Sequence, residues 1–402
     1  MDKQLTAKIQ YSVDRFISWL ENYGEISYDH QSFFAGPLGG RAKALYYKEP
    51  LLGTIAVSPM IFFEAFVPSA RQLFWKPQRF PIADAHYAMG FAFLTKVTGE
   101  RKYLERAVHF LNVLEKTRCP GFELFCWGYP FDWVTRGGII AKDTPLITTT
   151  PYAYEAFLEV YLIDKNKKWL EILHSIADHA IRDIKDFEIS PGENACSYTP
   201  YDQGGVINAS AYRAFLLTSA SVHLSEEKYW KIAEGNLNFV LKKQQSNGSW
   251  YYSIDGERDF IDHFHTCFVL KALAKIEKIT GHSECRQAIE KGVKYYVDNL
   301  FDEKSLPKPF SKAPRLTVYK HELYDYAECI NLCVLLKDRF KEMDRILQAV
   351  LEDLLTRWQT KKGSFRARKL LIGWDSVPMH RWAQSQLFRS LSFLLDQEKK
   401  HS

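Results

Sequence analysis

The sequence predicts an all-α fold, an (α/α)6 barrel in which six helical hairpins close into a ring. The first observation behind this prediction is a repeat of apolar, helix-like segments at spacings of 56 to 61 residues. The residues that open five of these segments are Thr150, Asn208, His265, Tyr326 and Trp382. An earlier copy centres on His86. Such a repeat indicates units that bury their apolar faces against their neighbours.

The second observation is an alternation of two kinds of helix. Residues 225–244 place apolar side chains on one face, which is typical of an outer helix, whereas 152–163 are apolar nearly all round, which indicates burial. Inner helices are therefore expected at 82–98, 151–164, 208–223, 265–280, 325–338 and 379–395. Outer helices are expected at 100–118, 166–186, 225–244, 283–299 and 341–358.

The third observation is that these outer helices number one fewer than the inner helices. A helix over about 4–23 fills the gap if it packs beside the last inner helix, so we expect one ring domain over residues 1–402. Residues 24–80 do not fit the repeat. Their Pro and Gly residues interrupt long helices, so we expect an irregular flap over one end of the ring or a connection without a chemical role.

Composition limits the classes of function. The 402 residues include 53 basic and 48 acidic side chains, a net charge of +5, which gives little support to nucleic-acid binding. No apolar stretch of about 18 residues predicts a membrane span, and the first residues lack the apolar region of a signal peptide, so we expect a cytoplasmic protein. The seven Cys form no CxxC pair, and we expect neither a metal nor a cofactor.

The long loops all precede inner helices, so we expect them to meet at one end of the ring. Six helix N-termini carry partial positive charge there, which suits anionic or polyhydroxyl ligands. Aromatic residues make up 15% of the chain, and many lie in these loops beside acidic residues. Aromatic faces stack on sugar rings while Asp, His and Arg bind hydroxyl groups. The alternative is that the loop aromatics merely plug the ring and the Asp residues cap helices.

The candidate catalytic residues are Asp132, Asp262 and His265, with Asp84, Asp202 and Asp375 in reserve. The candidate substrate-binding residues are Trp127, Tyr129, Tyr198, Asp202, Asn208, Trp250, Tyr252, His380, Arg381 and Trp382. His263 and His265 near two Asp residues also suggest a metal, but their spacing matches no known metal motif. We favour an acid/base or hydrogen-bonding role for His265 over burial in the core.

Several loop motifs occur in order along nearly the whole chain. They are 128–133, 144–150, 197–200, 248–252, 261–266 and 381–384. As a set they resemble a bacterial polysaccharide-biosynthesis family, often labelled VpsJ-like, of the six-hairpin glycosidase-like superfamily. The resemblance implies a role in exopolysaccharide or surface-glycan production, with other proteins of that pathway as partners, and supplies no established reaction. Residues 233–250 also resemble the QW repeat of terpene cyclases, but the acid clusters of those enzymes are missing from the sequence.

Three functions fit these observations. The first is hydrolysis of a glycosidic bond in an oligo- or polysaccharide, with Asp132 and Asp262 as acid and base about 6.5–9.5 Å apart. The second is epimerisation or β-elimination of a uronate, in which His265 removes the C5 proton and Arg381 neutralises the carboxylate. Tyr198, Tyr252 and Asn208 are further candidates for that chemistry. The third is a non-catalytic glycan-binding or scaffold protein of a polysaccharide pathway.

Overall fold

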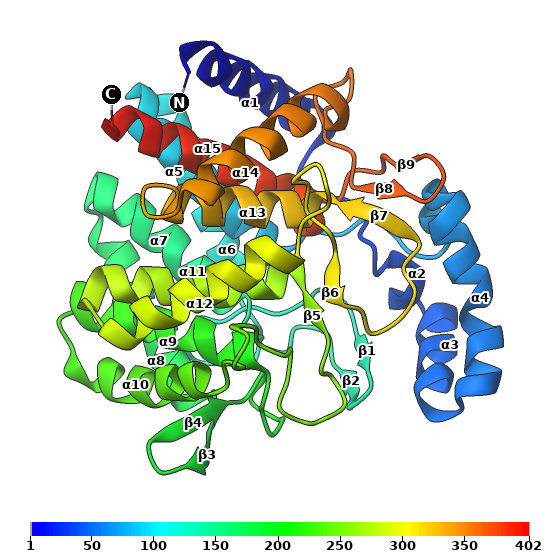
Figure 1. Ribbon diagram of the computed structural model, residues 1–402, viewed down its shortest axis with the longest axis horizontal. Helices are drawn as coiled ribbons and strands as arrows, with labels where there is room; N and C mark the ends of the chain where they lie inside the picture. The colour runs from blue at the N-terminus through cyan, green and yellow to red at the C-terminus, as the bar shows by residue number, and fades with distance from the viewer. Residues whose placement is uncertain (1, 402) are drawn as a thin grey trace.

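The inner helices form a closed ring, as predicted (Figure 1). The structure is a computed structural model that describes residues 2–401. The inner helices are α5 (Pro81–Thr98), α7 (Thr150–Asp164), α9 (Ile207–His223), α11 (His263–Thr280), α13 (Leu323–Leu336) and α15 (Ser385–His401). Each packs on the next, and α15 packs on α5. Most residues of these helices are buried, which explains why their sequences lack a polar face.

The outer layer supports this ring. Its helices are α1 (Lys3–Tyr23), α6 (Arg101–Lys116), α8 (Lys167–Arg182), α10 (Glu227–Lys242), α12 (Ser283–Asn299) and α14 (Lys341–Asp353). α1 packs against α15 and against the short π-helix η2 (Leu354–Trp358), which follows α14. The prediction that the first helix lies beside the last inner helix is thus confirmed. The two ends of the chain lie close together in Figure 1.

The seam between α5 and α15 is closely packed. A Cβ atom on Gly90 of α5 would lie 2.5 Å from the ring of Phe388 on α15, so no side chain fits there. Phe388 is buried and packs against Phe16 of α1, with ring centroids 5.4 Å apart, and against Phe91, at 4.8 Å. The seam therefore joins the first helix of the chain to the first and last inner helices.

Charged side chains fill part of the ring interior. Glu328 of α13 accepts hydrogen bonds from Lys271 of α11 and, at 3.1 Å, from Arg389 of α15. All three residues are buried. Because a buried charge is stable only when it is paired, this triad holds three inner helices in one arrangement.

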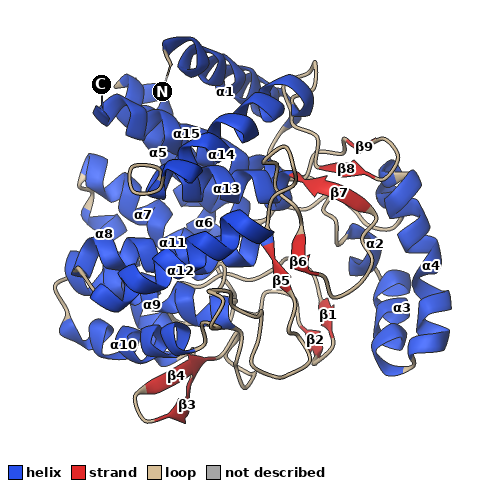
Figure 2. Cartoon of the chain, in the orientation of Figure 1, coloured by secondary structure: helices blue, strands red, loops and turns tan. Residues whose placement is uncertain are grey.

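The strands lie in the connections that lead from outer to inner helices (Figure 2). They form four small antiparallel sheets. The pairs are β1 (Trp133–Thr135) with β2 (Gly138–Ile140), β3 (Asp186–Ser190) with β4 (Glu193–Cys196), and β5 (Ile261–Asp262) with β6 (Phe310–Lys312). The fourth sheet orders β7 (Tyr319–Glu322), β8 (Arg368–Leu370) and β9 (Trp374–Asp375). The pairing of Asp262 with Phe310 fixes the point at which α11 begins.

Residues 24–80 differ from the expectation of an irregular segment, which is wrong for much of their length. They contain α2 (Ser32–Ala35), a hairpin of α3 (Pro37–Lys48) and α4 (Pro50–Phe66), and the 3-10 helix η1 (Pro68–Leu73). Pro37 and Pro50 open their helices, where a missing N–H is harmless. A Cβ on Gly53 would lie 2.0 Å from the Cα of Tyr46, so glycine allows α3 and α4 to touch. Pro37 and Pro50, which were expected to break helices, instead start them, and Gly53 allows two helices to pack closely.

Candidate functional site

The site is built around a His–Asp pair at the start of α11. Asp262 is the N-cap residue, and its Oδ1 accepts a hydrogen bond from the backbone N–H of His265 at 2.9 Å. Its Oδ2 lies 2.6 Å from Nδ1 of His265. The buried carboxylate therefore holds the imidazole with the proton on Nδ1, so that Nε2 presents its lone pair. None of residues 2–401 hydrogen-bonds Nε2, and the His265 side chain is 23% exposed.

A water-sized cavity of about 10 Å³ lies next to this pair. Its lining includes His265, Asp262 and Asn208 of α9. The Oδ1 atom of Asn208 is buried and has no hydrogen-bond partner among the described residues. A free amide oxygen beside the imidazole suits a water or a hydroxyl group as a hydrogen-bond donor.

Aromatic side chains connect His265 to the far side of the mouth. Phe264 lies between the ring of His265, at 4.4 Å between centroids, and that of Trp382, at 5.6 Å. Trp382 stacks on Tyr324 with centroids 4.6 Å apart and planes inclined by 10°. The other face of the site is formed by Tyr252, whose ring meets His265 edge-on at 4.7 Å. Such a platform beside a polar pair is typical of a sugar site.

Two further tyrosines complete the mouth. The guanidinium of Arg381 lies 4.6 Å from the ring centroid of Tyr129. The hydroxyl of Tyr198 accepts a hydrogen bond from Thr148 at 3.1 Å. Burial, together with the phenols of Tyr252 and Tyr129, raises the pKa of Tyr198 well above its ordinary value. Tyr129, Tyr198 and Tyr252 therefore lie near one another, and each keeps its hydroxyl proton as a hydrogen-bond donor.

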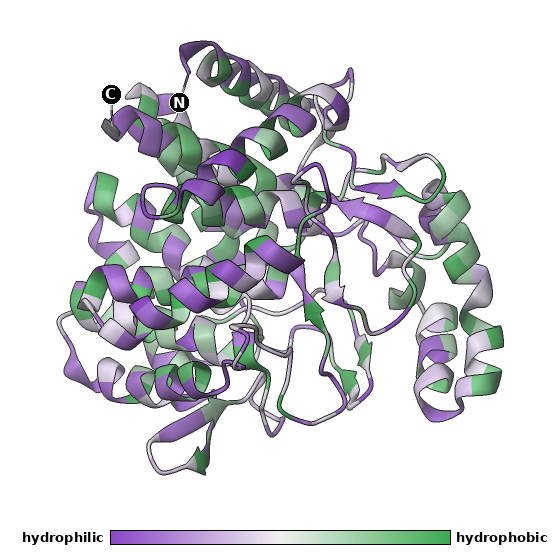
Figure 3. Cartoon of the chain, in the orientation of Figure 1, coloured by the Kyte–Doolittle hydropathy of each residue, from purple (hydrophilic) through white to green (hydrophobic). Residues whose placement is uncertain are grey.

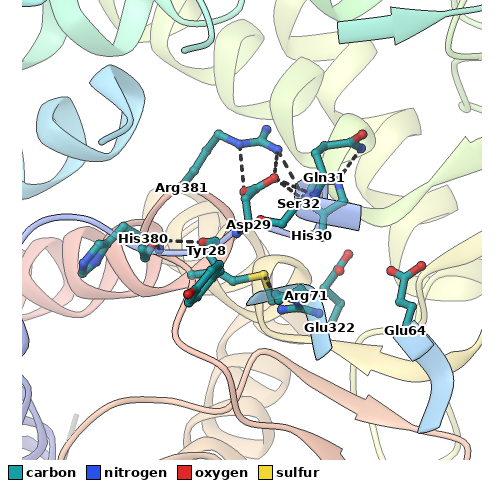
Figure 4. Close-up of polar contacts among 12 residues, drawn as sticks. Tyr28, Asp29, His30, Gln31, Ser32, Glu64, Arg71, Glu322, His380 and Arg381 are labelled. Atoms are coloured by element: carbon teal, nitrogen blue, oxygen red, sulfur yellow. Dashed lines mark hydrogen bonds and ion pairs between the residues drawn. The ribbon is translucent and has the colours of Figure 1, made fainter. Parts of the chain in front are cut away.

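Arg381 already has a carboxylate partner. Its Nε and Nη2 atoms lie 3.0 and 2.5 Å from the two oxygens of Asp29, which comes from the segment between α1 and α2 (Figure 4). Burial tends to raise the pKa of Asp29, but Arg381 and His30 outweigh it, and the pKa lies well below its ordinary value. His30 follows Asp29 and packs on Trp382, with centroids 4.2 Å apart. The segment before α2 thus covers part of the mouth.

A second acidic group lies beside the His–Asp pair. Asp325, in the first turn of α13, is fully buried, and neither carboxyl oxygen has a hydrogen-bond partner within the described chain. Burial, followed by the charges of Glu322 and Asp262, raises the pKa of Asp325 well above its ordinary value. The buried position thus disfavours the charged form of Asp325. Glu322 itself pairs with Arg368, whose Nη1 also contacts Glu64 of α4 at 2.5 Å.

Several predicted site residues have structural partners instead. Trp127 is buried in the core, and its indole N–H donates to the carbonyl of Leu114 at 2.8 Å. Trp250 donates in the same way to Val240 at 2.9 Å, although its ring also lines the small cavity. Both indoles therefore anchor a loop to the preceding outer helix.

His380 and two of the predicted Asp residues are also engaged elsewhere. His380 is buried between the hydroxyl of Tyr87, at 2.5 Å from Nδ1, and the carbonyl of Gly24, at 3.0 Å from Nε2. Asp132 is exposed and accepts the backbone N–H of Lys142 at 2.8 Å, within its own loop. The carboxylate of Asp202 accepts several N–H groups of its own turn, as a loop cap does.

The remaining histidine and the reserve acids are also accounted for. His263 is buried against Tyr296, at 2.7 Å, and burial lowers its pKa to about 3. Asp84 pairs with Arg79, and Asp375 pairs with Arg71. Within residues 2–401 no group of three His, Cys, Asp or Glu side chains is arranged to hold a metal ion.

The sequence analysis missed Asp29, His30, Tyr324 and Asp325. The first two lie in the segment that it set aside, and no short-range pattern links them to Arg381. Tyr324 and Asp325 were within reach, because they directly precede Tyr326, which opens one of the repeated segments. Their position at the start of an inner helix is the signal that was available.

No known protein family and no curated protein matches the sequence. Solved structures do resemble it. Cellobiose 2-epimerase from Bacillus thermoamylovorans B4167 is 10% identical, with a TM-score of 0.62, over 79% of this chain and 87% of that one. A D-mannose isomerase is 14% identical, with a TM-score of 0.61, over 81% and 89%. An unsaturated glucuronyl hydrolase from Bacillus sp. GL1 is 12% identical, with a TM-score of 0.58, over 79% and 87%. The chain therefore shares the (α/α)6 toroid fold of these structures.

Proposed function

We propose that this protein is a carbohydrate-active isomerase or epimerase that moves a proton at a saccharide carbon next to a carbonyl group. The observation that carries the proposal is the geometry of His265. Its Nδ1 is held by the buried Asp262 carboxylate at 2.6 Å, while Nε2 is left without a protein partner at the mouth of the ring. This is the arrangement of a general base whose tautomer and direction are fixed by its neighbour.

The reaction follows from that base. Nε2 of His265 takes the proton from the carbon beside the carbonyl, and the electron pair of the C–H bond moves to the carbonyl oxygen to give an enediolate. Return of the proton to the former carbonyl carbon, together with transfer of the hydroxyl proton from one oxygen to the other, completes an isomerisation. An epimerisation is completed when a second donor on the opposite face, such as a tyrosine hydroxyl, protonates the original carbon and the base later returns its proton to that donor. Hydroxyl donors such as Tyr198 and Tyr252 stabilise the enediolate oxygen by hydrogen bonding.

The ion pair of Arg381 bears on the choice of substrate. Removal of the C5 proton of a uronate needs a cation for the carboxylate, and the guanidinium best placed for this purpose is occupied by Asp29. A neutral sugar with a free reducing end makes no such demand, since its own aldehyde activates the C2 proton. The names of two similar structures, a cellobiose 2-epimerase and a D-mannose isomerase, also favour the reducing end. We therefore propose C2 of a reducing saccharide as the reacting carbon.

Hydrolysis of a glycosidic bond is the second candidate. The observation that favours it is the different surroundings of two acids: Asp325 is buried without a hydrogen-bond partner and its pKa is raised, whereas Asp262 is hydrogen-bonded to His265. A glycosidase needs one carboxyl group that keeps its proton and one that is ionised. The proposal of Asp132 as the acid loses support, since that side chain is exposed and bound within its own loop. In either case, the motif resemblance supports a place in polysaccharide biosynthesis.

Solvent exchange distinguishes the two reactions. The purified protein is incubated in D₂O with reducing oligosaccharides and with uronate-containing oligosaccharides, and the C2 and C5 protons are followed by NMR while chain length is followed by mass spectrometry. Deuterium at C2 without cleavage is the expected result. Cleavage without label overturns the proposal in favour of hydrolysis, and label confined to C5 moves the reaction to a uronate. Binding without either change favours a glycan-binding protein.

A further inference from the structure

Helix α4 presents an apolar face to solvent. Its large exposed side chains are Leu51, Leu52, Ile55, Phe62 and Phe66, which we call the α4 face. Leu51 is 80% exposed, Ile55 66% and Phe62 55%. Leu51, Ile55, Phe62 and Phe66 follow one another at spacings of four, seven and four residues, which keeps these four on one side of the helix, and Leu52 lies next to Leu51 at the edge of that side. Figure 3 shows α4 as largely hydrophobic, at the outer edge of the molecule.

The other exposed residues of α4 carry no charge. They are Pro50, Thr54, Ser58 and Pro59. The hydroxyl of Thr54 donates to the carbonyl of Pro50 at 2.7 Å, and that of Ser58 donates to the carbonyl of Thr54 at 2.6 Å. Both hydroxyl groups therefore have partners within the helix and need no water. Glu64, the one charged residue of α4, turns inward to Arg368. The helix thus tolerates an apolar surrounding along its whole outer side.

Neighbouring elements extend the apolar surface. Leu371 and Ile372 are exposed in the turn between β8 and β9, and the Arg368–Glu64 ion pair ties β8 to the C-terminal half of α4. Leu73 is exposed at the end of η1, which follows α4. These side chains project singly from separate turns, and Figure 1 shows the α3–α4 hairpin standing out from the ring. A projecting surface of this shape inserts into a fluid layer more readily than it matches a rigid partner.

The charges around the surface are mostly positive. In residues 36–78, 311–322 and 366–378, Glu49 is the only exposed acidic residue. Two further acids lie at the edge of this region: the exposed Asp132, beside strand β1, which packs on α3, and Asp259, which pairs with Lys312. The exposed basic residues there are Arg41, Lys48, Lys76, Lys312, Arg315 and Lys320. Arg315 lies near the hairpin, because its charge acts on Lys43 and Tyr47 of α3. A basic border around an apolar helix complements the negative surface of an anionic bilayer.

We propose that the α4 face is a membrane-binding surface, which lies in the headgroup region of an anionic lipid bilayer while the basic border contacts the lipid phosphates. The helix is about 25 Å long at 1.5 Å per residue, which suits an orientation parallel to the bilayer plane. This surface binds without crossing the bilayer, and no helix among the described residues is long and apolar enough to span one. The proposal is independent of the reaction proposed above.

Vesicle sedimentation tests this assignment. The full chain is mixed with vesicles of phosphatidylcholine alone and with vesicles that contain about 30% phosphatidylglycerol, and the bound fraction is measured at low and high salt. We expect binding to the anionic vesicles that weakens as salt rises. The double variant Ile55→Glu/Phe62→Glu should lower the partition coefficient about tenfold or more. The substitution Val222→Glu is the control, since Val222 is 56% exposed on α9, outside this surface, and should leave binding unchanged.

A second copy of the chain is the rival occupant. Sedimentation velocity of the wild-type protein and of the double variant, without lipid, measures it directly. A wild-type dimer that becomes a monomer in the double variant, with no vesicle binding by the wild type, overturns the proposal. Equal vesicle binding by the wild type and by a double variant with a native circular dichroism spectrum also overturns it. If the double variant fails to fold, Arg41→Glu/Lys48→Glu serves instead. It should reduce binding to the anionic vesicles and leave binding to the phosphatidylcholine vesicles unchanged.

Discussion

Asp29 and Arg381 are 352 residues apart in the sequence and form a buried, two-point ion pair at the mouth of the ring. The pair joins the segment that follows the first helix to the π-helix η3 (His380–Gln384), which leads into the last one. Tyr129 and Trp382 enclose the guanidinium, at 4.6 and 5.1 Å from its carbon atom. The pair therefore ties the segment after the first helix to the segment before the last one, and it leaves the Arg381 guanidinium already paired.

Removal of one partner should destabilise the fold strongly. Arg381→Met leaves the Asp29 carboxylate buried without a counter-charge, and we expect the free energy of unfolding in urea to fall by about 3–5 kcal/mol. The double variant Asp29→Leu/Arg381→Met removes both charges and should recover most of that loss. If the single and double variants lose equal stability, the unpaired Asp29 carboxylate is not what destabilises the single variant.

The pH dependence of this pair has a defined sign. The pKa of Asp29 is lower in the folded state than in the unfolded state, so its contribution is fully present above the unfolded pKa of about 3.8 and is lost as the pH falls below it. Asp29→Asn should therefore show a smaller loss of stability between pH 5 and pH 3 than the wild type. Urea titrations at both pH values measure the difference.

His265 should be required for proton transfer. His265→Gln keeps a polar side chain but removes the base, and we expect deuterium exchange to fall by roughly 10²–10⁴-fold with binding retained. His174→Gln is the matched control, because His174 also pairs with an acid, Glu226, at 3.1 Å but lies on the outer helix α8. A variant of His265 with wild-type exchange would remove the proposed base.

Asp262 should act through His265. Asp262→Asn still accepts the backbone N–H of His265, so the helix start is preserved, but it no longer favours the proton on Nδ1. We expect turnover to fall while the Michaelis constant changes little, because the imidazole is no longer held in the orientation and tautomer that leave Nε2 free. Unchanged turnover would make Asp262 a helix cap alone.

Acid should weaken the fold through His380. Burial lowers its pKa to about 4, from an ordinary value of 6.5, so the group stabilises the folded state fully above pH 6.5 and loses that contribution as the pH falls toward 4. The expected slope is about 1.4 kcal/mol per pH unit for one such histidine. His380→Gln should reduce the slope by that amount in thermal or urea unfolding, and an unchanged slope would contradict the assignment.

The ring was predictable because its signal is local and repeated. Each inner helix carries apolar residues on all faces, and each outer helix carries them on one, so the two kinds separate in the sequence. The position of Asp262 was predictable for the same reason, since a helix N-cap and the residue three positions later are neighbours in any helix. The direction in which a loop side chain points was not predictable from the sequence. Trp127 and Trp250 stand before inner helices, as Trp382 does, but their indoles turn toward the outer helices.

The covering segment escaped prediction because its partners are distant. Nothing near Asp29 in the sequence indicates an arginine from the far end of the chain. The α3–α4 hairpin escaped because Pro and Gly were interpreted as breakers, whereas Pro50 opens a helix and Gly53 permits a close contact. Whether a Gly permits a close contact between two helices can be seen only when the position of the neighbouring helix is known.

The close packing of α1 against α15 sets an order of events during synthesis. More than 350 residues separate the two helices, and at about 5–20 residues per second α1 waits on the order of tens of seconds for its partner. Phe16 and Trp19, which are buried in the finished ring, remain uncovered on the nascent chain for that time. The ring closes, and Arg381 reaches Asp29, only after the last inner helix has left the ribosome. A truncated product that lacks α15 therefore exposes the apolar face of α1 and is a natural substrate for chaperones and proteases.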